Sequence, residues 1–376
     1  MSGLSFIKNY DGRRVTSEFT WNALPDGEAD DGNGSDDDTE NRVLLDIEME
    51  ADDWRSINPQ LPAAWRASDW AARPVRFVDG KDAGQTIAWV RNPQGFPVSM
   101  RLAEIGGVAM RAIEGELRRE FAMQERVLTM DTSGFPWEEI ENFAIALSEF
   151  NLRLLPTTPV PADLELSFDR VERVRRFAQN RSRQEMSVLE EFVIAQDNRV
   201  PTIVDGILKD HEGGFDAAES PVFGVVKTHR RTYLHALGHQ VLFDLAEGER
   251  TPAFSFEYDT SQRTERGATS RLPIVAWFVR LCGKDVMPNF GLVRVEVSQL
   301  WFKNQGYLSA AGEITGTGRD FVNQLTRTIH EYRCRRSNYR RAAISIEPIV
   351  RAEDSLGALF CPPEILKSKF YRMTGL

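Results

Sequence analysis

The sequence predicts an α/β protein whose core is a mixed β-sheet with flanking helices and helical insertions. Short apolar runs separated by Gly, Asp and Asn-Pro turn signals are typical of strands, and long stretches with helical periodicity lie between them. The run "VPTIVDGIL" (200–208) is almost continuously apolar, as expected of a central strand that is buried on both faces.

The elements are expected in a definite order. The order is an antiparallel meander of short strands at 75–79, 85–92 and 96–105, helices that start near Gly106 and at 136–154 and 166–196, strands within "VPTIVDGIL", "SPVFGVVKTH", "LPIVAWFVRL" and "FGLVRVEVSQLWF", and a helix at 319–336. We therefore expect strands at both ends of the body and a mainly helical middle.

Charge and composition divide the chain into two parts. Residues 1–72 are expected to form an acidic, partly disordered extension, and residues 73–376 the main domain with a helical insertion at about 106–196. The net charge is −10, but thirteen acidic residues and one arginine lie between Asp26 and Asp53, so the rest of the chain is close to neutral.

Two segments of the extension differ in character. The run at 24–41 lacks aromatic residues and is predicted to be disordered; a solvated linker is favoured over electrostatic mimicry of nucleic acid. Trp54, Trp65 and Trp70 need a packing partner, so the segment that contains them is expected to dock on the main domain or on a second subunit.

Composition restricts the class of protein. With 41% hydrophobic and 27% charged residues, and with "PIVAWFV" (273–279) among the longest apolar runs, the sequence predicts a globular protein without a membrane span. Three cysteines without CxxC spacing and no export signal favour a reducing, cytoplasmic setting. The absence of a GxxxxGK[ST] motif argues against ATP hydrolysis by this chain.

Two aspartates occupy equivalent local settings, Asp79 in "FVDGK" and Asp205 in "IVDGI". Asp-Gly after a strand is a common turn signal, and two unrelated turns remain an alternative. If the first and fourth strands of the sheet are neighbours, both carboxylates emerge side by side and repel each other unless a cation lies between them. Hard oxygen ligands suit Mg²⁺ or Mn²⁺, and metal-bound water cleaves phosphodiesters in RNase-H-like folds.

Four motifs in this order resemble those of the NurA family of nucleases, over roughly residues 73–300: "RFVDGKDAG", "PTIVDGIL", "PVFGVVKTHRRTYL", and the late strands "RLPIVAWFVRL" and "FGLVRVEV". The resemblance implies an RNase-H-like core, Mn²⁺-dependent cleavage of DNA, a homodimer, and partnership with a HerA-type hexameric ATPase that translocates DNA in end resection. "DGIL" has Ile207 where the family often has serine, and Lys81 departs similarly in the first motif.

The resemblance also assigns roles to individual residues. Asp79 and Asp205 match the metal-ligand aspartates, and Lys227 matches a lysine that could bind the scissile phosphate. The family adds a glutamate from the helix before the second aspartate, for which Glu190 is the first choice; the alternatives are Glu185, Glu191 and Glu114. The histidine of the family has no clear match, and His330 is a candidate by location alone.

Further charged residues suggest contacts with DNA. The stretches "RVERVRRFAQNRSR" and "HEYRCRRSNYRR" combine arginines with Tyr332 and Tyr339, which suits phosphate contacts and base stacking; their candidate DNA-binding residues are Arg175, Arg176, Arg335 and Arg336.

Two other pairs of residues have weaker interpretations. His235 and His239 have the spacing of a helical metal pair, but a zinc site is disfavoured because no HExxH pattern accompanies them. Arg280 and Glu296 lie on predicted strands and are interpreted as a structural pair.

These observations favour a metal-dependent deoxyribonuclease that acts on DNA ends with a HerA-like ATPase, in repair or in anti-phage defence. The alternative is a catalytically inactive NurA-like adaptor or DNA clamp that assembles on the ATPase.

Overall fold

The computed structural model describes residues 2–15, 45–160, 169–208, 216, 218–227, 233–257, 272–283 and 287–376. The strands are β1 (Arg13–Arg14), β2 (Leu45–Asp46), β3 (Arg76–Arg91), β4 (Pro97–Ile113), β5 (Glu116–Met130), β6 (Arg153–Pro156), β7 (Thr202–Asp205), β8 (Val222–Val226), β9 (Phe254–Glu257), β10 (Pro273–Arg280) and β11 (Leu292–Ser298). The α-helices are α1 (Phe6–Asn9), α2 (Trp137–Ser148), α3 (Asp169–Ala195), α4 (Ala236–Asp244), α5 (Gln299–Asn304), α6 (Gly316–Glu331), α7 (Glu347–Gly357) and α8 (Pro363–Thr374). The run predicted to be disordered lies outside these described residues.

The described strands form one mixed sheet in the order β2-β9-β10-β11-β8-β7-β3-β4-β5-β6, with β1 paired to β3. Strands β3, β4 and β5 are antiparallel, whereas β7 lies parallel to β3 on one side and to β8 on the other. The first strand of the meander is therefore the neighbour of the central strand β7, which is the condition under which the two aspartates were expected to lie side by side. The predicted α/β class is confirmed, and so is the buried central position of β7.

The middle of the body differs from the prediction. The helix predicted to start near Gly106 is wrong, because this segment forms the end of β4, a turn at Glu114–Gly115 with positive φ at both residues, and β5. The stretch is rich in Glu, Arg, Leu and Met, which favour helices, but pairing along the whole length of β4 and β5 overrides that weak preference.

The strands predicted at 75–79 and 85–92 are one strand, β3. Asp79 and Gly80 are not in a turn: they pair with Val108 and Gly107 of β4, and β3 continues to Arg91 with a register irregularity near Thr86. The Asp-Gly turn signal is therefore misleading at this position.

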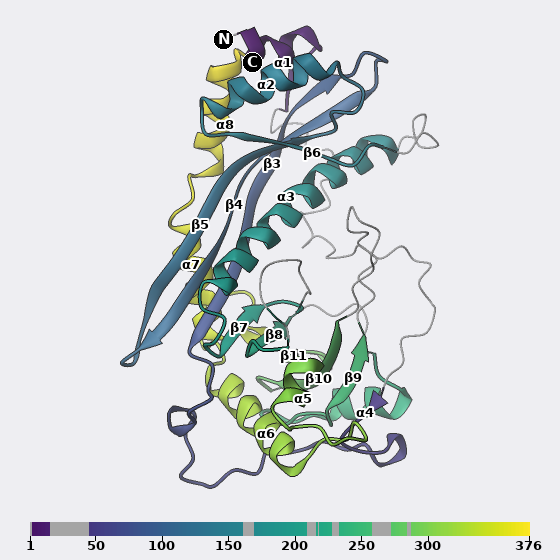
Figure 1. Cartoon of the computed structure of the whole chain (residues 1–376), viewed down its shortest axis with the longest axis vertical. Coiled ribbons are helices and arrows are strands. Elements are labelled where there is room, and N and C mark those ends of the chain that lie inside the picture. The colour runs from purple at the N-terminus through teal and green to yellow at the C-terminus, as the bar shows by residue number, and fades with distance from the viewer. Residues whose placement is uncertain are drawn as a thin grey trace.

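Helices cover both faces of the long strands (Figure 1). Helix α3 runs diagonally across β3 and β4, where Leu189 shares a buried cluster with Ala103 and Ile105 of β4. Helix α7 packs on the other face, where Leu356 shares a cluster with Val108 of β4. At the far end of the strands, α1, α2 and α8 close a separate core.

The lower part of the sheet is also covered on both faces, by side chains that alternate along β10. Trp277 belongs to the core that includes Phe321 of α6, whereas Phe278 belongs to the core that includes Leu242 of α4. This explains why the predicted strand "LPIVAWFVRL" is apolar except for Arg280. Among the described helices, none is both long enough and apolar enough to cross a bilayer.

The tryptophan-containing segment docks on the main domain of the same chain, which is one of the two arrangements predicted from the sequence. Trp54 is buried against Phe254 and His235, and Trp70 packs edge-on against Phe321. Short 3₁₀ helices, η3 (Ala51–Asp53) and η4 (Ala67–Asp69), shape the segment between them. Trp65 is half-buried.

Two adjacent glycines allow α3 to approach the sheet closely. A Cβ atom on Gly107 would lie 3.0 Å from the Cα atom of Glu190, and one on Gly80 would lie 3.2 Å from the Oε2 atom of the same residue. We expect Gly107→Ala to lower the free energy of unfolding by about 1–3 kcal/mol, because the backbone of α3 must move away. Urea unfolding measures this effect.

Gly316→Ala is the matched control for that substitution. Gly316 lies in the first turn of α6, and a Cβ atom there would meet nothing within 4 Å. The control should leave stability unchanged or slightly increased. Equal effects of the two substitutions would contradict the close packing of α3 on β4.

Candidate active site

The two predicted aspartates lie next to each other. The parallel register between β3 and β7 ends with Val78 opposite Val204, and Asp79 and Asp205 are the next residues of their strands. Asp79 is only 6% exposed, in the middle of a long strand, whereas Asp205 ends β7. Gly206 follows with φ of 115°, a conformation that favours glycine, and the chain leaves the sheet there.

Lys227 reaches the same point from the neighbouring strand. It follows β8 directly, and its Nζ atom lies 2.7 Å from Oδ2 of Asp205. The lysine side chain is 6% exposed and that of Asp205 is 24% exposed, so water screens the pair only partly. The structure therefore places one positive charge beside the two carboxylates.

Among the proposed glutamates, Glu190 lies at the site. It approaches β3 from α3 at Gly80, the residue after Asp79. The last turn of α3 is anchored by Arg76, a buried residue of β3 that donates to the carbonyl oxygens of Val193 and Ile194. Positive charge at a helix C-terminus is stabilising. The contact with Arg76 also fixes the position of Glu190 along β3.

The alternatives to Glu190 have other surroundings. Glu185 forms ion pairs with Arg153 and Arg181, which lower the pKa of its carboxyl group against the opposing effect of burial. Glu114 is exposed at the tip of the β4–β5 hairpin, roughly 20 Å along the strand from the position opposite Asp79. Glu191 is buried on α3, adjacent to the first choice.

A fourth carboxylate, Glu353 of α7, was not predicted from the sequence. It lies close enough to Asp79 to raise the pKa of that residue, and its Oε2 atom accepts a hydrogen bond of 2.8 Å from the hydroxyl group of Tyr339. Burial and this contact raise the pKa of Tyr339. Nothing in the local sequence marks Glu353, because only the docking of α7 on β3 brings it to the site.

Electrostatic strain is concentrated on Asp79. Burial raises the pKa of its carboxyl group well above the usual value, and the negative charges of Asp205, Glu190 and Glu353 raise it further. Lys227 acts in the opposite direction but does not cancel these effects. The site therefore has an excess of negative charge, so an additional cation would be stabilised there.

The donor set is chemically suited to a hard divalent cation. All four acidic groups supply carboxylate oxygens, which Mg²⁺ and Mn²⁺ prefer. Within the described part of the chain, no three acidic, histidine or cysteine side chains lie close enough to form a complete ligand set. A metal held by Asp79, Asp205 and Glu190 would therefore require their side chains to rotate toward one another.

A buried ion pair holds the loop after Asp205. Oε2 of Glu296 accepts the backbone N–H of Leu208 at 3.0 Å, and Oε1 accepts from Arg294 at 2.8 Å. The predicted pairing of Arg280 with Glu296 is therefore wrong. Arg280 instead donates to backbone carbonyl groups, among them that of Pro288.

The remaining histidine candidates lie in other surroundings. His235 is the N-cap of α4, accepts the N–H of Gly238 and packs on Trp54, so it does not form a helical metal pair with His239. His330 at the end of α6 pairs with Glu247, and burial and Arg333 lower its pKa. None of the charges that shift the pKa of His330 belongs to the acidic site.

The candidate DNA-binding arginines differ in their ion-pair partners. Arg175 and Arg176 pair with Glu172 on the same helix. Arg336 pairs with Glu347 and Asp354 of α7, whereas Arg335 is exposed.

Other side chains near these residues contribute to the fold. Tyr332 packs edge-on against Phe77 and donates to the carbonyl group of Pro74, so it supports the core. Lys81 reaches the end of α7, where its Nζ atom would lie 3.1 Å from a Cβ on Gly357.

Comparison with known proteins gives few matches. No protein-family model matches this chain, and no curated protein matches it in sequence. Among solved structures, the chain is similar to the NurA nuclease from Sulfolobus solfataricus, with a TM-score of 0.40 and 10% identity over 86% of each chain.

We expect the protein to become more stable when the charge of Asp79 is removed, and the size of this gain to depend on pH, because burial and neighbouring carboxylates disfavour the ionised form of Asp79. The pKa of Asp79 is higher in the folded state than in the unfolded state. Stability therefore falls as the pH rises from the unfolded-state pKa to the folded-state pKa, and at higher pH the ionised carboxylate destabilises the fold. In the presence of a chelator at pH 7, Asp79→Asn should therefore raise the melting temperature, and the gain should disappear at acidic pH.

The same measurement with added Mn²⁺ tests the proposed cation. Mn²⁺ should raise the melting temperature of the parent protein and affect Asp79→Asn much less. Glu116→Gln, at an exposed position of β5, is the control and should behave like the parent. A lower melting temperature for Asp79→Asn in chelator would contradict the repulsion described here.

Proposed function

We propose that the chain is a metal-dependent deoxyribonuclease that hydrolyses phosphodiester bonds. The observation that supports this most strongly is the convergence of Asp79, Asp205 and Glu190 beside Lys227, with an excess of negative charge that burial intensifies. Such a cluster is costly to maintain unless it serves to bind a cation, and carboxylate-held cations are widely used to activate water for attack on phosphorus.

The position of each residue at the site suggests its role in the proposed reaction. Asp79, Asp205 and Glu190 would hold Mn²⁺ or Mg²⁺, which when bound supplies an activated water and stabilises charge at the phosphorus. Lys227, once released from Asp205, would contact a phosphate oxygen of the scissile group. Glu353, held by Tyr339, would adjust the charge of the site from the α7 side.

DNA would reach the site past the loop that precedes α7. Tyr339 joins this loop to Glu353, and the exposed Arg335 lies on the same loop. Arg336, Arg175 and Arg176 are further candidates for phosphate contacts, for which each would exchange its present carboxylate partner.

The four sequence motifs that resemble NurA support a wider role. We propose that the protein acts as a homodimer with a HerA-like hexameric ATPase that supplies DNA translocation, in DNA end processing or anti-phage defence. The chain lacks a P-loop motif of its own, which is consistent with an external motor.

The direct test is incubation of the protein with linear DNA and Mn²⁺, beside Asp79→Asn. The parent should degrade the DNA, and the variant should lose activity by about a hundredfold or more, because a carboxylate that holds the cation is removed. Gel electrophoresis of end-labelled DNA measures the rate. Equal activity of the two proteins would exclude Asp79 as a catalytic residue.

The choice among the glutamates of α3 has its own test. Glu190→Gln should lower the cleavage rate by roughly tenfold to a hundredfold, because one metal-holding oxygen is lost. Glu185→Gln on the same helix is the matched control and should retain activity, since Glu185 pairs with Arg153 and Arg181. The reverse ranking would transfer the role to Glu185.

One observation favours a second candidate function, an inactive adaptor or DNA clamp on the ATPase. The Nζ atom of Lys227 already neutralises Asp205, as a metal ion would in an active enzyme. Absence of cleavage by the parent with Mn²⁺ and the ATPase both present, together with intact DNA binding, would favour the adaptor.

A further inference from the structure

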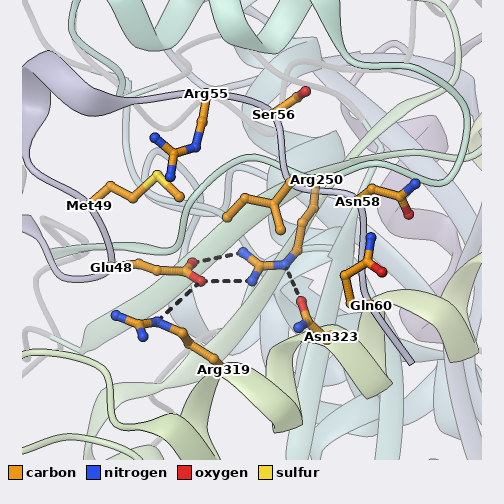
Figure 2. Close-up of a pocket in the computed structure, with 10 residues that line it drawn as sticks. Glu48, Met49, Arg55, Ser56, Asn58, Gln60, Arg250, Arg319 and Asn323 are labelled. Carbon is orange, nitrogen blue, oxygen red and sulfur yellow. Dashed lines mark hydrogen bonds and ion pairs between the residues drawn. The ribbon is translucent and has the colours of Figure 1, made fainter. Parts of the chain in front are cut away.

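A second polar pocket lies far along the sheet from the acidic site and shares no lining residue with it. Its volume is about 530 Å³, and it is formed by the segment from Glu48 to Gln60, by Arg250, and by Arg319 and Asn323 of α6 (Figure 2). The side chains that line it are mainly arginines and amides. Pockets that bind small molecules have volumes of about 300–1,000 Å³, and this pocket falls within that interval.

The floor of the pocket is a buried ion pair in which the charges of Arg250 and Glu48 balance each other. The side chains of Arg250 and Glu48 are 1% and 2% exposed and form two hydrogen bonds of 2.7 and 2.8 Å. Glu48 also accepts the N–H of Ala253 at 2.7 Å. The carboxylate is thus fully used, and the floor presents little net charge to a ligand.

Two arginines of the pocket keep their charge available. Arg319 has a side chain that is 54% exposed, and its nearest carboxylate oxygen, on Glu48, is 4.0 Å away and already bound by Arg250. Arg55 is exposed and makes no ion pair within the described part of the chain. In Figure 2, Arg55 and Arg319 flank the Glu48 carboxylate, one on each side of it. Guanidinium groups with exposed donors suit an anion such as a phosphate.

Amides also line the pocket. Asn58 and Gln60 lie beyond Arg250 from Arg55 and Arg319, and Asn323 lies beside Arg250, one turn of α6 from Arg319 (Figure 2). The Oδ1 atom of Asn323 accepts from Nε of Arg250 at 2.9 Å, so this residue has its amide N–H groups left to donate. Amide groups pair with the hydrogen-bonding edges of nucleobases, which combine donors and acceptors.

We infer that this pocket binds a nucleotide. The phosphate contacts the exposed guanidinium groups of Arg55 and Arg319, and the base edge contacts Asn58 and Gln60. A free deoxynucleoside monophosphate and the 5′-phosphorylated end of a DNA strand share this chemistry. The pocket is therefore a nucleotide-binding site separate from the acidic site, and its existence does not depend on the nuclease activity proposed above.

Calorimetric titration of the full chain in EDTA tests this inference, since chelation prevents metal-dependent binding elsewhere. The probes are thymidine monophosphate, thymidine, inorganic phosphate, and hexathymidylate with and without a 5′-phosphate. Thymidine monophosphate or the phosphorylated oligonucleotide should bind measurably tighter than the corresponding probe without phosphate. Which of the two binds more tightly identifies the source of the nucleotide.

Variants assign the binding to this pocket. Arg319→Gln and Arg55→Gln should each weaken nucleotide binding by about tenfold, because a hydrogen bond to a charged group is lost. Arg118→Gln, an exposed arginine at the tip of the long hairpin, is the matched control and should bind like the parent. Both pocket arginines are exposed, so the variants should fold normally, which circular dichroism verifies.

The amides provide a separate readout. Asn58→Ala with Gln60→Ala should weaken thymidine monophosphate binding by about fivefold and leave inorganic phosphate binding unchanged. The inference is overturned if no probe binds at millimolar concentration, if the arginine variants bind like the parent, or if inorganic phosphate binds as tightly as the nucleotide.

Discussion

The parallel pairing of β3 with β7 determines that the carboxylates of Asp79 and Asp205 lie side by side. Backbone hydrogen bonds fix the register of Val78 against Val204, so Asp79 and Asp205 cannot separate without loss of sheet pairing. Asp79 lies within a strand that continues for many residues beyond it, which removes the freedom a loop residue would have. The surrounding residues must therefore accommodate two carboxylates at a fixed spacing, and Lys227 is the group that now does so.

Glycines make this arrangement compatible with close packing. Gly80 and Gly107, paired across β3 and β4, provide the space in which α3 brings Glu190 to the strand. On the other side, a Cβ atom on Gly224 would lie 2.7 Å from the carbonyl oxygen of Gly206, so the chain after Asp205 can lie against β8 only if residue 224 has no side chain. Backbone thus lies close to the acidic site on two sides, which contributes to the burial of Asp79.

The sequence predicted that Asp79 and Asp205 lie side by side only if the first and fourth strands are neighbours, and left two unrelated turns as the alternative. The parallel pairing of β3 with β7 meets that condition. The sequence was insufficient for the segment after Gly106, where residues with helical preference form a hairpin stabilised by pairing between strands. Glu353 could not be found either, since its role depends on where α7 packs. The sequence also did not predict the ion pair of Glu296, which forms with Arg294 of the same strand and not with Arg280.

The buried pair of Glu48 and Arg250 has a consequence for the behaviour of the protein at high ionic strength. Contacts between exposed arginines and phosphates weaken steeply as salt is added, because counterions compete for them. A buried ion pair is screened far less by salt. Glu48 links the N-terminal segment both to Arg250, by this ion pair, and to the backbone N–H of Ala253, the residue before β9. Salt should thus weaken the proposed contacts with nucleic acid or nucleotide while the segment that shapes the polar pocket stays in place.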